Sequence, residues 1–193
     1  GSDLIIAFFD PRDLISSLES LGLTVIFLDM PSDVSGVFDQ IELLGHATDH
    51  VEESTFLIAD MEKRILAVED NIAESEKGIR IFHELDPMLF TVGPGSFVDD
   101  LYNILGADNI AAVTDQSFPQ LSNEAVIESD PEVIILADES MGETFDTVSA
   151  RDGWGDMSAV LNGRVHMVDK DIMSRPGPRL VEALEILYEL LYP

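Results

Sequence analysis

The chain contains no cysteine among its 193 residues. That absence excludes disulfide bonds, thiolate metal sites and cysteine nucleophiles, although it leaves the compartment open. Long apolar runs are also missing, because stretches such as VIILA at 133–137 are far too short to cross a bilayer. We therefore expect a protein that is not membrane-spanning.

Basic residues are scarce in this chain. Ten Lys and Arg stand against 38 Asp and Glu, which gives a formal net charge of −28. A field of this sign repels phosphate backbones and anionic lipids, so nucleic acid is not an expected partner. A solvated acidic surface explains the excess of carboxylates without any acid-specific function.

Motifs of nucleotide binding and of serine hydrolysis are absent too. The glycine-rich stretch Gly93-Pro94-Gly95-Ser96 lacks the lysine of a P-loop and the spacing of a dinucleotide fingerprint. It is also not the G-x-S-x-G turn of a nucleophile elbow. We interpret Ser96 as the N-cap of the following helix, and the loop as a tight turn at the carboxyl end of a strand. Open α/β sheets bind ligands at such ends, and no cofactor is implied.

Histidines do not form a clear metal-binding pattern. His46 and His50 are four residues apart and could share one helical face, as metal-binding pairs do, but Gly45 interrupts that pattern. Surface or capping roles are therefore favoured for both. No nucleophile–base–acid set stands out elsewhere, so we predict no metal site and no catalytic residues.

The first 47 residues have the pattern of a parallel α/β sheet. LIIAFF and TVIFLD are continuous apolar strands, and each is followed by a helical stretch. Two strands cannot bury enough surface to be stable alone, so we interpret residues 1–47 as the C-terminal remnant of an N-terminal lobe. The opening GSDLIIAFFD has no basic segment or cleavage site, so we expect a start inside a domain and no export signal in this chain.

One long helix is predicted next, over residues 49–76. Apolar residues at spacings of seven, three and four form a single stripe along it, from Val51 to Ile72. About 26 helical residues would span about 39 Å at about 1.5 Å per residue, which is longer than a small domain is wide. We therefore interpret residues 48–78 as an interlobe helix, a rigid strut between two lobes.

Residues 79–193 are predicted to form a complete C-terminal α/β lobe with a parallel sheet. The expected strands are 79–84, 89–92, 109–113, 132–137 and 164–168, and the expected helices are 96–105, 122–129 and 179–191. Loops after these strands carry Met, aromatic and a few Arg side chains. Such a set suits a broad and partly apolar ligand.

The order of several segments resembles one protein family over essentially the whole chain. These segments are LLGHATDHVEE, ELDPMLFTVGPGSFVDDL, FPQLSNEAVIESDPEVIILAD, LNGRVHMVD and RPGPRLVEALEILYELLYP. They resemble the solute-binding proteins of ABC importers for cobalamin and ferric siderophores. In that family a single rigid helix joins two α/β lobes with the ligand between them. The resemblance implies an extracytoplasmic protein, periplasmic or anchored at the cell surface, that delivers its ligand to an ABC permease.

The resemblance also implies roles for particular positions. Family members present one surface glutamate per lobe to arginines of the permease, and the segment QLSNEAV places Glu124 at the second-lobe position. Glu124 can also stabilise the first turn of its helix. The implied ligand-lining positions are Phe9 and Asp10 from the remnant, with Met88, Phe118, Trp154 and Arg175 from the complete lobe.

The expected ligand is a corrinoid or a neutral to cationic iron chelate. Arg151 and Arg175 are the candidate cations of the cleft, and the net charge of −28 disfavours a strongly anionic ligand. Three other classes stay open. A metal-ion-binding two-lobe protein would need His and carboxylate ligands that are scarce on the loops, and an α/β hydrolytic enzyme would need a base paired with Ser96. A single-lobe interaction module is the third, and the unpaired sheet edge of the remnant allows a homodimer.

Overall fold

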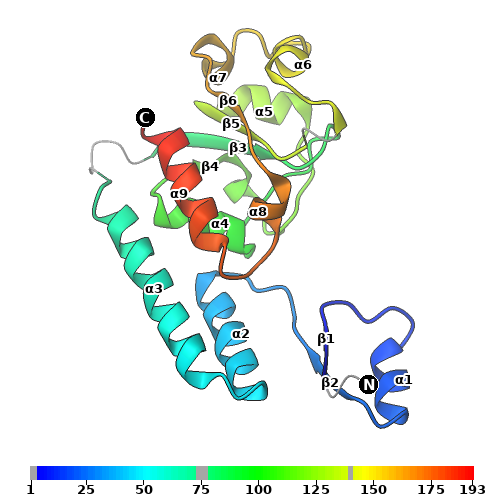
Figure 1. Cartoon of the computed structure of the whole chain (residues 1–193). Helices are drawn as coiled ribbons and strands as arrows, with labels where there is room; N and C mark the ends of the chain where they lie inside the picture. The colour runs from blue at the N-terminus through cyan, green and yellow to red at the C-terminus, as the bar shows by residue number, and fades with distance from the viewer. Residues whose placement is uncertain (1–3, 73–77, 139–140) are drawn as a thin grey trace. The chain divides into compact units, whose positions relative to one another are not determined.

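The computed structural model describes residues 4–72, 78–138 and 141–193. Contacts divide the chain into two compact units, Gly1–Pro31 (unit 1) and Ser32–Pro193 (unit 2). Unit 1 contains β1 (Leu4–Ala7), α1 (Leu14–Ser20) and β2 (Thr24–Phe27), and its two strands pair in parallel (Figure 1). Because α1 buries none of its residues, the described part of unit 1 has no packed helix–sheet core, as expected for two strands.

Unit 2 is built on a four-stranded parallel sheet. The strand order is β4 (Asp108–Asn109), β3 (Arg80–Glu84), β5 (Val133–Leu136) and β6 (Val165–Met167). The two central strands are buried along nearly their whole length: β5 is entirely apolar, whereas β3 also carries the buried polar residues His83 and Glu84. This pattern is typical of parallel strands that are covered on both faces.

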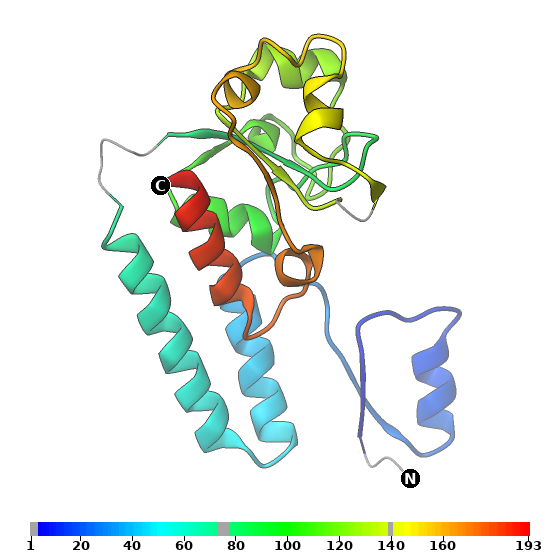
Figure 2. The same ribbon diagram turned by 45° about the horizontal axis from the view of Figure 1, so that its top comes forward.

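Helices cover both faces of this sheet (Figures 1 and 2). On one face, α4 (Phe97–Ile104), α8 (Lys170–Ser174) and α9 (Leu180–Leu191) pack on Ile81 and Ile135. On the other face, α5 (Asn123–Ser129), α6 (Phe145–Ser149) and α7 (Ser158–Leu161) pack on Phe82 and Ile134. Successive strand residues thus supply two separate cores, because side chains alternate across a strand.

Two further helices, α2 (Val34–Ala47) and α3 (Val51–Glu69), pack against each other, and α3 also packs against α9. The guanidinium of Arg64 on α3 donates hydrogen bonds of 2.9 and 2.7 Å to the two carboxylate oxygens of Glu185 on α9. None of the described helices is both long enough and apolar enough to cross a membrane.

The helix predicted over residues 49–76 is shorter in the structure. It ends at Glu69 after 19 residues, a length of about 28 Å. Asp70 and Asn71 are weak helix formers, and the side chain of Asn71 bonds back to the carbonyl of Ala67. Residues 73–77 lie outside the described residues. The contact division falls after Pro31, so α2 lies in unit 2, and the assignment of 1–47, 48–78 and 79–193 to lobe remnant, interlobe helix and lobe stays a prediction.

Two of the predicted strands are wrong. Residues 89–92 form only isolated antiparallel bridges, Glu84 with Thr91 and Phe90 with Gln120, because the chain turns back after β3. Leu89 closes this turn with a positive φ of 65° and a hydrogen bond from its N–H to the carbonyl of Asp86. Residues 109–113 supply only the end of β4, followed by the 3-10 helix η2 (Ile110–Val113).

Candidate functional site

Loops that follow the parallel strands of unit 2 all leave the sheet at one edge. Residues 85–96 follow β3, 110–122 follow β4, 137–138 and 141–144 follow β5, and 168–179 follow β6. We call this the carboxyl edge. Open α/β sheets bind their ligands there, so these loops form the candidate site.

The glycine loop is held against the loop after β4 by backbone hydrogen bonds. Gly93 N–H donates to the carbonyl of Ser117 at 2.8 Å, and Thr91 N–H donates to that of Pro119 at 2.9 Å. A Cβ on Gly93 would collide with the carbonyl oxygen of Gln116 and would lie 3.0 Å from Pro119 Cδ. Glycine is therefore required at this position by the close approach of the two backbones.

Ser96 is buried and caps α4, as predicted. Its Oγ accepts a hydrogen bond from Asp99 N–H at 3.2 Å and donates one to the carbonyl of Gly93 at 2.8 Å. Among the described residues, the hydroxyl thus bonds to backbone atoms rather than to a catalytic base. This arrangement gives no support to a nucleophilic serine.

Met88 and Phe118 are exposed on these two paired loops. Their exposed fractions are 62% and 49%. Gln120 Nε2 donates a hydrogen bond of 2.9 Å to the carbonyl of Met88, which ties the loops together again. Two apolar side chains are therefore presented at the carboxyl edge by backbone that is already fixed, an arrangement that suits a ligand with a broad apolar face.

Trp154 lies in the core instead of at the surface. It has no exposed area, its ring packs edge-on against Phe82 with centroids 6.0 Å apart, and its Nε1–H donates to Asn123 Oδ1 at 2.6 Å. A large aromatic ring gains most by full burial when its N–H finds a partner. This buried position gives no support to the predicted role of Trp154 in lining the ligand site, which stays a prediction.

Arg151 forms ion pairs with two protein carboxylates. Its guanidinium donates to both oxygens of Glu84 at 2.6 and 2.5 Å and to Glu143 at 2.7 Å. Glu84 is fully buried, and Asp138 is buried beside it. Burial and the neighbouring Glu84 raise the pKa of Asp138 to about 7. This cluster was not predicted from the sequence, although a glutamate at the end of the buried segment RIFHE is a signal for it, because a buried charge needs a partner.

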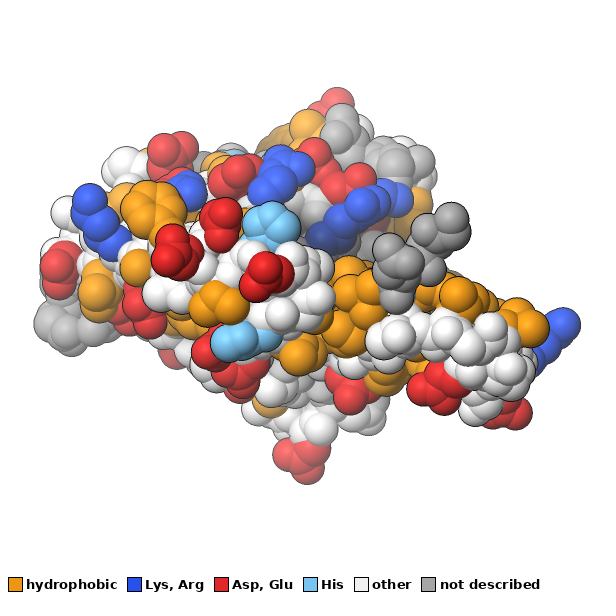
Figure 3. All heavy atoms as spheres, turned by 60° about the horizontal axis from the view of Figure 1, so that its bottom comes forward, with side chains coloured by type: hydrophobic (Ala, Val, Ile, Leu, Met, Phe, Trp, Pro, Cys, Tyr) orange, Lys and Arg blue, Asp and Glu red, His pale blue; other side chains and the backbone are white. Residues whose placement is uncertain are grey.

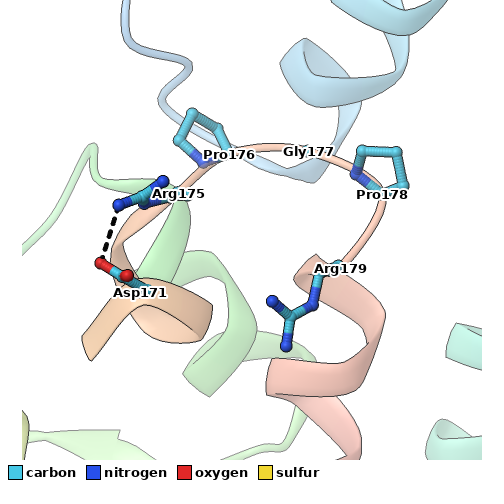
Figure 4. Close-up of a pocket in the computed structure, with 6 residues that line it drawn as sticks. All are labelled: Asp171, Arg175, Pro176, Gly177, Pro178 and Arg179. Carbon is cyan, nitrogen blue, oxygen red and sulfur yellow. Dashed lines mark hydrogen bonds and ion pairs between the residues drawn. The ribbon is translucent and has the colours of Figure 1, made fainter. Parts of the chain in front are cut away.

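Arg175 lines a hollow of about 300 Å³ between α8 and α9 (Figure 4). The segment Pro176–Pro178 curves around this hollow, with Arg175 and Arg179 on either side of it. Arg175 pairs with Asp171 at 3.0 Å, and Arg179 pairs with Glu182 at 2.9 Å. Because all four side chains are largely exposed, these pairs are weak and can be exchanged for a ligand's acceptor group.

Three more candidate residues lie on exposed parts of the chain. Phe9, after β1 in unit 1, is 73% exposed. Asp10 follows it, and its Oδ1 accepts a hydrogen bond of 2.9 Å from Ile15 N–H at the start of α1, so Asp10 stabilises that turn. Glu124 is exposed in the first turn of α5, two residues after the N-cap Ser122, where a carboxylate stabilises the helix.

The described histidines and carboxylates do not converge on a metal site. Within the described residues, no group of three or more His, Asp or Glu side chains is arranged to hold a metal ion. His50 Nδ1 lies 2.7 Å from the carbonyl of Thr48, and His46 lies 3.9 Å from Glu42. On the face drawn in Figure 3, carboxylates are spread among other side chains, as expected of a solvated acidic surface.

Known proteins share both the sequence pattern and the fold of this chain. Residues 3–172 match the model of the periplasmic binding protein family. An ABC transporter substrate-binding lipoprotein of Bacillus subtilis (strain 168) is 32% identical over 186 residues, which cover 94% of this chain and 58% of the relative. A cobalamin-binding protein of Halobacterium salinarum is 27% identical over 189 residues, which cover 94% of this chain and 51% of the relative. This chain thus spans little more than half the length of either relative.

A solved structure of a periplasmic solute-binding protein also resembles this chain. It is that of a possible iron-binding (periplasmic solute-binding) protein from Staphylococcus epidermidis ATCC 12228, which superposes with a TM-score of 0.88 and 25% identity over 99% of this chain and 76% of that one. The predicted resemblance and the α/β fold class are confirmed. The chain belongs to the periplasmic binding protein family.

Proposed function

We propose that this chain is part of the extracytoplasmic solute-binding component of an ABC importer and that its ligand lies against the carboxyl edge of unit 2. Family membership and the substrate-binding relative support a binding role without catalysis. The observation that carries the proposal is the exposure of Met88 and Phe118 on two loops that are hydrogen bonded to each other. Fixed apolar side chains at this edge lower the cost of ordering the site when a ligand binds.

The proposed ligand is a corrinoid or a neutral to cationic ferric chelate. A relative that is a cobalamin-binding protein and a structural neighbour described as possibly iron-binding support these two classes. Among the described residues of the carboxyl edge, Arg151, Arg175 and Arg179 already pair with carboxylates. A strongly anionic chelate would have to displace those carboxylates in a chain of net charge −28. The amide groups of a corrinoid can instead accept hydrogen bonds from Arg175 at little cost.

The proposed protein partner is an ABC permease. Glu124 is exposed in the first turn of α5, where its carboxylate is available to a cationic side chain. An arginine of the permease can bind such a carboxylate with two parallel hydrogen bonds. We propose Glu124 as the residue of unit 2 that docks on the permease.

Calorimetric titration of the full-length protein tests the ligand class. The probes are cyanocobalamin, ferrichrome (neutral) and ferrioxamine B (cationic), with ferric citrate as the anionic comparison. We expect one of the first three to bind with a Kd of about 1 μM or lower, a free energy of about −8 kcal/mol. Tighter binding of ferric citrate would contradict the ligand class, and no binding of any probe would contradict the proposed function.

A further inference from the structure

A continuous series of side-chain contacts runs from the carboxyl edge to the first turn of α5. It begins at Glu84 and Glu143, passes through the guanidinium of Arg151 and the indole of Trp154, and ends at Asn123. One end therefore lies at the carboxyl end of β3, whose following loop carries Met88 of the proposed ligand site, and the other end adjoins Glu124, the proposed docking residue.

The first end is an ion-pair cluster with little access to water. Glu84 is the last residue of β3, and Glu143 immediately precedes Thr144, the N-cap of α6. The Glu84 side chain has no exposed area, and those of Glu143 and Arg151 are only 15% and 19% exposed. Separating a buried pair leaves a charge without compensation. A displacement of either carboxylate is therefore expected to move Arg151 with it.

The middle of the series is a stacked pair of side chains. The guanidinium carbon of Arg151 lies 4.5 Å from the centroid of the Trp154 ring. Phe82 of β3 contacts the same ring edge-on, at an interplanar angle of 71°. Because cores are close-packed, an indole with no exposed area cannot tilt independently of these neighbours. A shift of Arg151 is thus passed to the Trp154 ring.

The last contact fixes the start of α5. Trp154 Nε1–H donates to Asn123 Oδ1 at 2.6 Å, and Asn123 Nδ2 donates to the carbonyl of Asp152 at 3.3 Å. Asn123 is the first residue of α5, and Glu124 is the second. The side chain of Asn123 therefore joins the first turn of α5 to the Trp154 ring and to the backbone carbonyl of Asp152.

We infer that Arg151, Trp154 and Asn123 couple ligand binding at the carboxyl edge to the first turn of α5, where Glu124 is exposed. The inference rests on the proposed function, which supplies both the ligand and the permease. The three residues are positioning residues, since they act through their neighbours. Coupling of this kind is reciprocal, so binding of the permease at α5 changes ligand affinity by the same factor.

Hydrogen exchange of the first-turn amides of α5 tests the inference. The reporters are Ala125 and Val126, whose amides bond to Ser122 Oγ at 3.1 Å and to Ser122 O at 3.2 Å. Exchange is measured on the full-length protein with and without the probe that binds among cyanocobalamin, ferrichrome and ferrioxamine B. We expect the probe to change both exchange rates about fivefold or more in the wild type, and less than about twofold in Trp154→Phe, which loses the N–H donor.

Tyr102→Phe is the matched control for this experiment. It also removes one buried hydrogen bond, that between the Tyr102 hydroxyl and His83 Nδ1 at 2.8 Å, but Tyr102 belongs to the core on the opposite face of the sheet. We expect it to keep the wild-type response. Asn123→Ala, which removes the acceptor at the helix start, provides the same test if Trp154→Phe does not fold.

Two results would overturn the inference. One is an equal exchange response in the wild type and in the linking variants, and the other is no response in the wild type although the probe binds. Failure of all three probes to bind is a different outcome, because it contradicts the proposed function and removes the inference with it.

Discussion

Both carboxylate oxygens of Glu84 accept hydrogen bonds from the guanidinium of Arg151, at 2.6 and 2.5 Å. This pair fixes the end of β3 to the segment that follows α6. The Glu84 side chain is fully buried, whereas in the pair of Arg175 and Asp171 the side chains are 73% and 53% exposed. The two arginines of the predicted cleft therefore have different energetic roles.

Removal of Arg151 is expected to destabilise unit 2 strongly. Arg151→Ala leaves Glu84 buried without its cation, so we expect the free energy of unfolding to fall by about 3–5 kcal/mol. Arg175→Ala breaks only an exposed pair and should cost less than about 1 kcal/mol. Urea unfolding of both variants measures the difference. Similar losses of unfolding free energy in the two variants would show that the buried Glu84 does not need Arg151 as its counter-ion.

Asp138 is expected to make stability fall as the pH rises. Burial, together with the neighbouring Glu84, raises its pKa from 3.8 to about 7. Between pH 3.8 and about pH 7 the Asp138 carboxyl is therefore protonated in the folded protein and ionised in the unfolded chain. The free energy of unfolding falls as the pH rises through this range, and the contribution of the bound proton is lost by about pH 7. Asp138→Asn stays uncharged, so its free energy of unfolding relative to the wild type should rise by about 3 kcal/mol between pH 5 and pH 8.

His83 opposes this trend, which is why the comparison with the variant is needed. Burial lowers the pKa of His83 from 6.5 to about 4, so the stability due to its neutral form is present above pH 6.5 and is lost as the pH falls toward 4. The two slopes have opposite signs and largely cancel in the wild type. Urea unfolding at a series of pH values measures the free energy of unfolding of the wild type and of Asp138→Asn. A difference between these two free energies that does not vary with pH would refute the role of Asp138.

Gly93→Ala is expected to disrupt the paired loops of the carboxyl edge. Its Cβ would collide with the backbone oxygen of Gln116, and we expect a loss of about 1–3 kcal/mol in the free energy of unfolding. Gly155→Ala is the control, because the nearest atom to its Cβ would be Ser149 O at 3.6 Å, an ordinary contact. Thermal unfolding of the two variants checks this. Equal melting temperatures would mean that the loops after β3 and β4 can move apart at Gly93 without a loss of stability.

Glu124→Gln is expected to impair transport without changing ligand affinity. The variant keeps the size of the side chain and removes the charge proposed to bind the permease, so uptake by cells should fall about tenfold or more. Glu128→Gln on the same helix is the control, since Glu128 is also exposed. Uptake of labelled ligand and calorimetry measure the two effects. Wild-type uptake by Glu124→Gln would exclude Glu124 as a docking residue.

Much of the sheet of unit 2 could be predicted from the sequence. β3, β5 and β6 fall within the predicted strands because each is a short segment that contains apolar residues and lies between turn or helix signals. The segments 89–92 and 109–113 are equally apolar, but local bonds decide their structure. The turn at Asp86 reverses the first segment, and Asn109 Oδ1 accepts a hydrogen bond from Ala111 N–H, which starts a 3-10 helix in the second.

The candidate site could be predicted only in part. Met88 and Phe118 are exposed at the carboxyl edge, as an apolar ligand surface requires, because loop position follows from strand order. The burial of Trp154 against Phe82 and the pairing of Arg151 with Glu84 could not be predicted, because both are contacts between residues far apart in the chain. Periodicity reports local structure and carries no information on such a pair.

The most direct test of the proposed ligand site compares Phe118→Ala with Leu161→Ala. Phe118 is at the carboxyl edge, whereas Leu161, 69% exposed, ends α7 just before β6 and so lies at the opposite edge of the sheet. Both changes remove an exposed apolar side chain. The measurement is calorimetric titration of the full-length wild type and both variants, with cyanocobalamin first. We expect the Kd to rise about tenfold or more for Phe118→Ala and less than about twofold for Leu161→Ala. Equal affinities in all three proteins would contradict a ligand site at the carboxyl edge.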